Sequence, residues 1–175
     1  MKSEFLGDSY DIVKRFFRDI LSPIAPLKAD PYFIESSLLS GEYERVTGIA
    51  LLSNGQTKPI GVLLDPDTGI RAPDHHRDAT RSHATTQYIA DVLRDSSVAY
   101  CIVYDQSYHR NSVRKTDQLT AKLQELENRS VVGFYYVSHA PFLFAARHGR
   151  TLAALRKALL NAGIPSGMFF PSQTN

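Results

Sequence analysis

The chain has 175 residues, of which 43% are hydrophobic, and this is enough to close the core of a single domain over residues 1–175. Its 20 lysine and arginine residues nearly balance its 18 aspartate and glutamate residues, so global charge gives no reason to expect binding to nucleic acid or to a membrane surface. No apolar run approaches the roughly 18 residues that span a bilayer, and residues 1–7 lack the apolar segment of a signal peptide. We therefore expect a soluble, cytoplasmic protein.

The first half of the chain predicts strands that alternate with helices. A short strand at 3–7 precedes a helix capped by Asp8 or Ser9, which ends near Leu21 and carries its apolar residues at spacings of three and four. Lys14 lies off that apolar stripe. Prolines make a connector of 22–31, and 32–39 is either a short helix or irregular. Strands are expected at 44–52 and 60–64, with a turn at 53–56.

The second half continues the alternation. A polar loop at 68–80 leads to a helix capped by Thr80 or Ser82, and the strand 98–104 is the most apolar run, so we expect it at the centre of the sheet. Its one cysteine, Cys101, is expected to be buried. A second polar loop at 109–115 precedes a helix that opens at Thr116. Its apolar side is formed by leucines at 119, 123 and 126.

The last part of the chain contains two extended segments, 131–137 and 142–146, which an antiparallel hairpin would explain. A final helix capped by Thr151 and an edge strand at 168–170 follow. The whole pattern predicts a three-layer, Rossmann-like α/β domain with a mainly parallel central sheet.

Aspartates follow three of the predicted strands and are the main functional signal. These residues are Asp8, Asp65 and Asp105, with Asp11 and Asp67 close behind. Ligands of open α/β sheets bind beyond the carboxyl ends of the strands. If the strands are parallel neighbours, the carboxylates repel one another unless a cation joins them, and Mg²⁺ or Mn²⁺ is the expected ion. The alternatives are that Asp8 caps the first helix, that residues 65–69 form an ordinary turn, and that Asp105 bonds the backbone of its own loop.

Basic side chains crowd the two loops after these strands, where they would suit a phosphate-containing substrate. We assign substrate binding to Arg77, Tyr108, His109 and Arg110, and expect Arg77 and Arg110 to hold phosphate. An exposed, solvated loop is the alternative. His139 follows the predicted strand 131–137 and is a candidate for proton transfer, against a structural role.

Two resemblances bear on function. Asp65-Pro66-Asp67-Thr68 resembles the Asp-Pro-Pro-Tyr motif of amino-group DNA methyltransferases, but the second proline and the base-stacking aromatic are missing. Residues 5–8 also lack the glycine-rich turn that such enzymes use for S-adenosylmethionine. The aspartate-tipped strands are similar in plan to metal-dependent nucleases of the PIN and NYN type, which implies metal-assisted cleavage of nucleic acid.

These patterns predict a metal-dependent phosphoesterase, in its preferred form a nuclease. Asp65, Asp105 and His139 would be catalytic, and Asp8, Asp65, Asp67 and Asp105 would bind the metal. Nucleic acid or another phosphate-containing ligand would be the partner. The alternatives are a methyltransferase-like protein that uses S-adenosylmethionine and a non-catalytic binding or regulatory module. Metal-dependent binding would favour the phosphoesterase, and stabilisation by S-adenosylmethionine would favour the methyltransferase-like protein. A response to neither would favour the binding or regulatory module.

Overall fold

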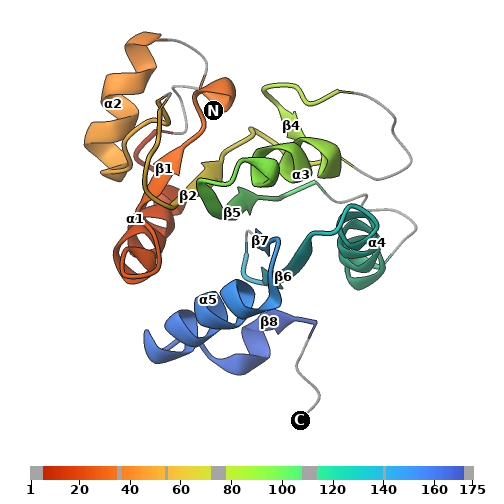
Figure 1. Cartoon of the computed structure of the whole chain (residues 1–175). Coiled ribbons are helices and arrows are strands. Elements are labelled where there is room, and N and C mark those ends of the chain that lie inside the picture. Colours follow the sequence, from red (N-terminus) through yellow and green to blue (C-terminus); the bar gives the residue numbers. More distant parts are fainter. Residues whose placement is uncertain are drawn as a thin grey trace.

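The computed structural model describes residues 6–34, 37–53, 55–71, 78–107, 114–139 and 141–171. They form an α/β domain with a six-stranded sheet of order β1-β2-β5-β7-β6-β8 and a separate two-stranded sheet, β3-β4 (Figure 1). The strands are β1 (Leu27–Ala29), β2 (Ile60–Leu64), β3 (Gly69–Ile70), β4 (His83–Ala84), β5 (Val98–Tyr104), β6 (Val132–Tyr136), β7 (Phe142–Ala146) and β8 (Phe169–Phe170). The helices are α1 (Ser9–Leu21), α2 (Ser37–Thr47), α3 (Thr86–Arg94), α4 (Lys115–Glu127) and α5 (Gly149–Asn161), with short 3₁₀ turns η2 (Pro31–Phe33) and η3 (Ser166–Met168).

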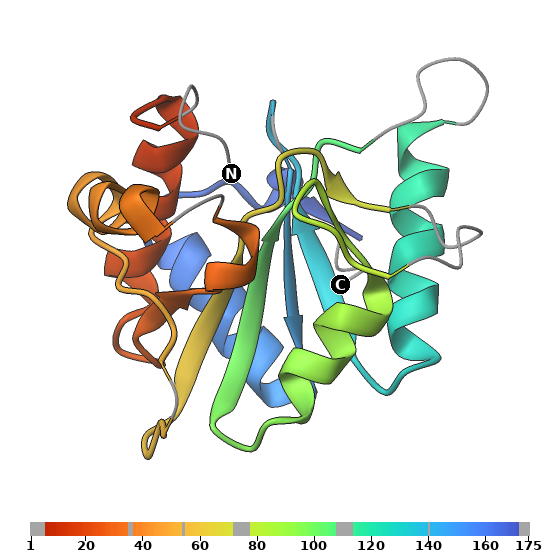
Figure 2. The ribbon, with the colours of Figure 1, turned by 90° about the horizontal axis from the view of Figure 1, so that it is seen from above.

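The sheet is mixed, and most of its strands run in one direction. β1, β2 and β5 pair in parallel, whereas β7 is antiparallel to both β5 and β6. β6 therefore runs in the same direction as β5. Figure 2 shows β2 and β5 side by side, so that both strands end at the same edge of the sheet. The β6–β7 hairpin, the interior position of β5 and the edge strand β8 confirm the sequence predictions.

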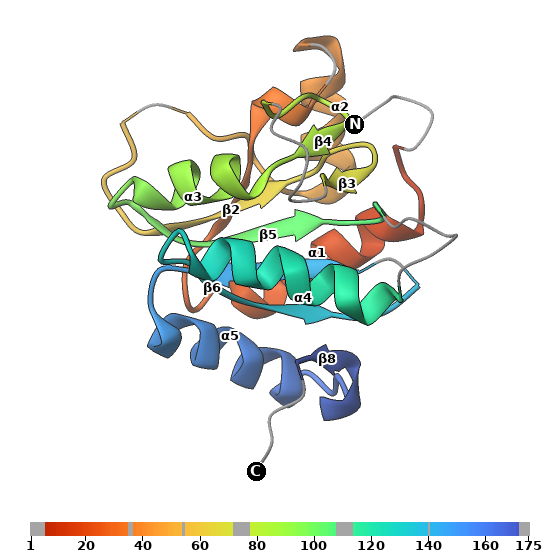
Figure 3. The same ribbon diagram turned by 90° about the vertical axis from the view of Figure 1, so that its right-hand side faces the viewer.

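Helices cover both faces of the sheet. Successive side chains of its strands point to opposite faces, and the side chains on both faces are apolar. Leu63 of β2 and Ile102 of β5 pack with α1, α2 and α5 in one core. Leu64 and Val103, their chain neighbours, pack with α3 and α4 in the other. Figure 3 shows α3 and α4 in front of the sheet and α1 behind it. This three-layer arrangement confirms the predicted fold class.

The prediction of a strand at 44–52 is wrong. The chain there continues α2 as far as Thr47, and only Leu51 makes an isolated parallel bridge, to Ala29 of β1. Leu39, Tyr43 and Thr47 are all buried and lie four residues apart, which is the spacing of one helix face. Burial of this helix face in the tertiary structure thus outweighs the local strand preference of residues 44–47.

Several boundaries also differ from the predictions. β1 lies inside the predicted proline-rich connector, β3 lies inside the predicted polar loop 68–80, and β4 follows that loop. The side chain of Thr85 caps α3, in place of Thr80 or Ser82, and α5 begins at Gly149, before the predicted cap at Thr151. In the predicted strand at 3–7, Leu6 and Gly7 form a turn, and the rest lies outside the described residues, as does Asn54 of the predicted turn. No helix in the described ranges is both long and apolar enough to cross a bilayer.

Candidate functional site

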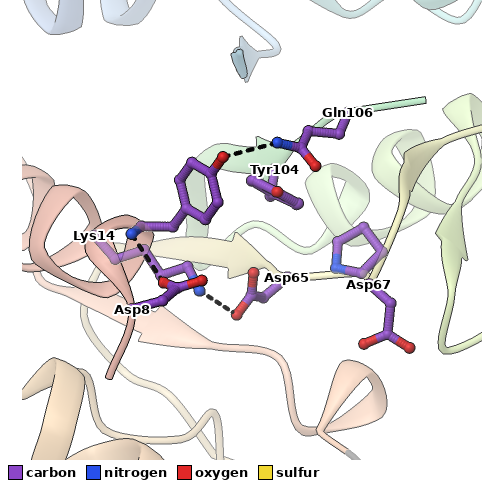
Figure 4. A pocket seen from close by; sticks show the side chains of 8 residues that line it. Asp8, Lys14, Asp65, Asp67, Tyr104 and Gln106 are labelled. Carbon is purple, nitrogen blue, oxygen red and sulfur yellow. Dashed lines mark hydrogen bonds and ion pairs between the residues drawn. The ribbon is translucent and has the colours of Figure 1, made fainter. Parts of the chain in front are cut away.

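A small cavity lies where the N-terminus of α1 meets the C-terminal ends of β2 and β5 (Figure 4). Its volume is about 120 Å³. It is lined by Asp8, Tyr10, Lys14, Asp65, Pro66, Asp67, Tyr104 and Gln106. Three of the predicted metal ligands, Asp8, Asp65 and Asp67, therefore share one cavity, although Asp8 is far from the other two in the sequence.

Asp8 reaches this cavity as the N-cap of α1, and the described part of the chain shows no strand before it. Its Oδ1 accepts hydrogen bonds from the backbone N–H groups of Tyr10, at 2.8 Å, and Asp11, at 3.2 Å. The Asp11 side chain accepts a further bond from the N–H of Gly7, at 2.7 Å. Asp8 thus satisfies donors that the first turn of a helix leaves unpaired, and Asp11 binds the residue that precedes the cap. The capping role considered for Asp8 is therefore present.

Lys14 is the residue that the sequence reasoning missed. Although it lies off the apolar stripe of α1, it is only 3% exposed, and its Nζ lies 2.9 Å from Oδ1 of Asp11 and 2.6 Å from Oδ2 of Asp65. Burial favours the neutral amine, but the two carboxylates outweigh it and raise the pKa of Lys14. The side chain is thus an ammonium group that holds Asp65 against α1. The spacing of three between Asp11 and Lys14 was the available signal.

Tyr43 closes the inner side of this ion-pair cluster. Its ring centroid lies 5.8 Å from Nζ of Lys14, and its hydroxyl is buried. Burial, together with the nearby carboxylates of Asp65 and Asp11, raises the pKa of Tyr43 well above its ordinary value. The phenol therefore stays neutral and adds no charge to the cluster.

Negative charge exceeds positive charge on the cavity wall. Asp8, Asp65 and Asp67 contribute carboxylates, and Lys14 contributes the one ammonium among the lining residues. Figure 4 shows the carboxylate of Asp65 directed toward Lys14 and that of Asp67 directed away from it. The described residues contain no group of three or more aspartate, glutamate, histidine or cysteine side chains placed to hold one metal ion. The cavity suits a cation or a hydrogen-bond donor better than a bare phosphate.

Asp105 follows β5 but does not line the cavity. It is fully buried, and its Oδ1 accepts hydrogen bonds from the N–H of Ile70, at 2.9 Å, and that of Ser107, at 3.2 Å. Nζ of Lys122 lies 3.0 and 2.8 Å from its two oxygens, and the Tyr135 hydroxyl donates to Oδ2 at 3.0 Å. Burial lowers the pKa of Lys122 despite the Asp105 carboxylate. Asp105 thus anchors several elements inside the protein.

These bonds fasten the loop that carries Asp67. Gln106 donates its N–H to the carbonyl oxygen of Thr68 at 2.9 Å, and Thr68 donates to that of Ser82 at 2.9 Å. Gly69 has a φ of +130°, and a Cβ there would lie 2.5 Å from Oδ1 of Asp105. Only glycine tolerates both this positive φ and this close approach of Asp105. The turn at 65–69 is therefore a fixed feature of the site, held from the opposite face of the sheet.

The aspartate that follows β1 is Asp30, which the sequence reasoning did not single out. Its carboxylate accepts bonds from the N–H of Tyr32, at 2.9 Å, and the hydroxyl of Tyr88, at 2.7 Å. Burial and the bond to Asp30 raise the pKa of Tyr88. Because residues 22–31 were predicted to be a connector, Asp30 was not recognised as an aspartate that follows a strand.

The remaining predicted site residues lie away from the cavity or outside the described ranges. His139 is exposed in the β6–β7 connection and does not line the cavity. Arg77, Tyr108, His109 and Arg110 lie outside the described residues. Cys101 is buried, as predicted, and burial raises the pKa of its thiol.

Comparison of the chain with models of protein families, with curated proteins and with solved structures finds no match.

Proposed function

We propose that the protein is a metal-dependent phosphoesterase, in its preferred form a nuclease, and that Mg²⁺ or Mn²⁺ binds in the cavity described above. One observation carries this proposal. Carboxylates from the start of α1 and from the end of β2 meet in one cavity, where Lys14 is the single cation on the wall and does not neutralise them. Uncompensated carboxylates in a partly buried cavity repel one another and favour a cation.

The donor set fits magnesium chemistry without a complete cage of protein ligands. Mg²⁺ usually keeps several waters and binds one or two carboxylates together with substrate phosphates. Asp65 shares Oδ2 with Lys14, but a carboxylate has about four acceptor positions and keeps capacity for an ion. Asp8 or Asp67 would supply the second carboxylate. Because Asp105 is enclosed by donors inside the protein, we give it a positioning role and leave it out of the ligand set.

When bound, such an ion polarises a phosphoryl oxygen and activates a water molecule. The chain's own groups would orient the reactants. Lys14 holds Asp65 toward the cavity, and Asp105 holds the turn that carries Asp67. His139 keeps a proposed part in proton transfer, because it follows β6, which ends at the same edge of the sheet as β2 and β5. Phosphate binding by Arg77 and Arg110, with Tyr108 and His109 beside them, remains part of the proposal.

The first experiment is a calorimetric titration of Mn²⁺ into the wild-type protein and into Asp67→Asn. Asp91→Asn, which removes an exposed carboxylate on α3, is the matched control. Circular dichroism verifies that all three proteins are folded. We expect saturable binding that Asp67→Asn weakens and Asp91→Asn retains, followed by Mg²⁺-dependent cleavage of a labelled nucleic acid that chelator abolishes. Absence of heat with the wild-type protein would overturn the proposal.

A second candidate is a methyltransferase-like protein with Asp65 near a target amine. The aromatic that the Asp65-Pro66-Asp67-Thr68 motif lacks has a spatial counterpart, because Tyr10 and Tyr104 line the same cavity as Asp65. A thermal shift on addition of S-adenosylmethionine, without a shift on addition of Mn²⁺, would favour this candidate. A response to neither compound would favour the binding or regulatory module.

A further inference from the structure

The C-terminal part of the chain carries an excess of positive charge. Residues 128–175 contain four arginines and one lysine but no aspartate or glutamate. Arg129 pairs with Glu125 of α4, whereas α5 contains two of the arginines and the lysine without any acidic residue. The near balance of charge over the whole chain therefore conceals a basic region, and local positive charge favours an acidic partner.

A groove lies between this basic helix and the edge of the sheet. Its volume is about 250 Å³, and it shares no lining residue with the acidic cavity. Figure 3 shows α5 running alongside β6, with β8 near the end of α5. The walls of the groove are mostly apolar, and arginine is the one charged residue type in its lining. The lining includes Gly133 and Phe134 of β6, Leu152, Ala153 and Arg156 of α5, and Pro171.

The strand edge that forms one side of this groove is open. β8 pairs with β6 only at Tyr135 and Tyr136. Val137 donates its N–H to the carbonyl oxygen of Met168 at 2.7 Å, and the backbone groups of successive strand residues alternate in direction. Gly133 therefore directs its N–H and C=O to this same side, where no described residue pairs with them. Such an edge can pair with an extended peptide.

Arg156 supplies a positive charge inside the groove. Its Cζ lies 4.9 Å from the ring centroid of Phe169 and 5.7 Å from that of Phe134, and its Nη1 donates to the carbonyl oxygen of Pro171 at 3.4 Å. No acidic side chain in the described ranges forms an ion pair with it. Burial lowers the pKa of Arg156, because the guanidinium loses hydration without gaining a carboxylate. A carboxylate in the groove would provide the paired hydrogen bonds that arginine favours.

The spacing of the helix side chains matches that of an extended chain. Leu152 and Arg156 are four residues apart on α5, which is about 6 Å along the helix. Two residues on the same face of a strand are about 6.6 Å apart. A strand beside β6 could thus place an aliphatic side chain against Leu152 and Ala153, and an acidic side chain two residues away against Arg156.

We propose that the groove between β6 and α5 binds an extended, acidic peptide segment of a partner protein, which pairs with β6 at Gly133 and places a carboxylate on Arg156. A second copy of the chain would bring two basic helices together, which charge repulsion opposes. A nucleic-acid backbone would match the charge but would leave the apolar wall and the strand edge unused. The proposal does not depend on the phosphoesterase function, since the groove and the acidic cavity share no residue.

The test is an NMR titration of the ¹⁵N-labelled protein with the peptide Ser-Thr-Val-Thr-Glu-Thr-Ser, blocked at both ends so that glutamate is its one charge. One control peptide carries glutamine in place of glutamate. A second carries proline between valine and glutamate, where it interrupts strand pairing. Arg156→Gln is the variant, and Lys157→Gln is its matched control, because Lys157 is exposed on α5 and does not line the groove. Circular dichroism verifies that both variants are folded.

We expect saturable shifts of the amide signals of Gly133 and Leu152 with the glutamate peptide. Arg156→Gln, or glutamine in the peptide, should weaken binding by at least about 10-fold, because a charge-assisted hydrogen bond is lost. Lys157→Gln should bind normally, and the proline peptide should not bind. Absence of these shifts at millimolar peptide, or equal binding of the glutamate and glutamine peptides, would overturn the proposal.

Further arms of the test distinguish other occupants of the groove. Stronger shifts of the same signals with an oligothymidylate, shifts that depend on protein concentration without peptide, or peptide binding only after removal of residues 172–175 would each overturn the proposal. If Arg156→Gln is unfolded, Ala153→Glu replaces it, because Ala153 is exposed and a carboxylate there should repel the peptide. Unaltered binding by that variant would also overturn the proposal.

Discussion

Asp65 and Asp105 follow adjacent parallel strands yet lie on opposite faces of the sheet. The register pairs Leu64 with Val103, so the same register continued by one residue places Asp65 level with Tyr104 and Asp105 one residue beyond. Successive side chains of a strand point to opposite faces. Asp65 accordingly reaches Lys14 of α1, and Asp105 reaches Lys122 of α4. An offset of one residue thus assigns one carboxylate to the cavity and the other to the protein interior.

Replacement of Asp105 by asparagine should destabilise the protein by about 3–5 kcal/mol, because it leaves Lys122 as a buried charge without its carboxylate. The double variant Asp105→Asn/Lys122→Met should recover part of this loss. Urea unfolding of both single variants and the double variant measures the coupling. A coupling energy near zero would show that the ion pair is not the source of the effect.

Lys14→Met should have two opposite effects. Stability should fall by about 3–5 kcal/mol, because Asp11 and Asp65 are buried and lose their shared ammonium group. Affinity for Mn²⁺ should rise, because the removed cation no longer offsets the carboxylates on the cavity wall. Arg15→Met, at an exposed position of the same helix, is the control for both measurements. Unchanged metal affinity in Lys14→Met would contradict the proposed ion position.

Substitution of alanine at two glycines should change stability in opposite directions. Gly69→Ala introduces a Cβ 2.5 Å from Oδ1 of Asp105 at a φ of +130°, so we expect a loss of at least about 1–3 kcal/mol. Gly41 lies in α2, where an added Cβ meets nothing within 4 Å, so Gly41→Ala should gain about 0.5–1 kcal/mol. Chemical unfolding of the two variants measures both. Similar stabilities for the two variants would show that the turn at 65–69 is not held as described.

Two substitutions at Asp8 separate its role as a helix cap from its role as a metal ligand. Asp8→Ala should cost about 1 kcal/mol of stability, because the N–H groups of Tyr10 and Asp11 lose their acceptor. Asp8→Asn retains a capping oxygen and should be nearly as stable as the wild-type protein, yet it should bind Mn²⁺ more weakly. Wild-type metal affinity in Asp8→Asn would assign this residue to capping alone.

His83 should make the protein less stable in mild acid. Burial and the neighbouring cations of Arg71 and Lys122 lower the pKa of His83 below its ordinary 6.5, although Asp105 and Asp67 act in the opposite direction. The unfolded chain therefore takes up this proton at a higher pH than the folded protein does. Stability is complete above about pH 6.5 and falls as the pH drops through that value. Unfolding free energies of the wild-type protein and His83→Gln across this range should converge as the pH falls, and parallel curves would contradict the assignment.

Local pattern in the sequence determined much of the fold. The uninterrupted apolar run 98–104 required a strand covered on both faces, and β5 lies inside the sheet between β2 and β7. Leucines spaced by three and four residues predicted α4, and all of them are buried. The turn after residue 64 also followed from local pattern, since an apolar strand cannot continue through Asp65-Pro66-Asp67.

Only the tertiary structure decided which charged groups meet. The partner of Asp65 is 51 residues away, and its burial depends on how α1 packs against β2, which no local spacing encodes. The separation of Asp65 from Asp105 depends on strand register, and the sequence carries no direct record of register. The helical state of residues 44–47, which belong to the predicted strand 44–52, has the same origin, because burial of one face of α2 outweighs local strand preference. The sequence therefore placed Asp65 and Asp105 at the ends of strands, because local pattern marks where an apolar strand stops. Only the packing and register of the sheet decided which of these side chains share the cavity.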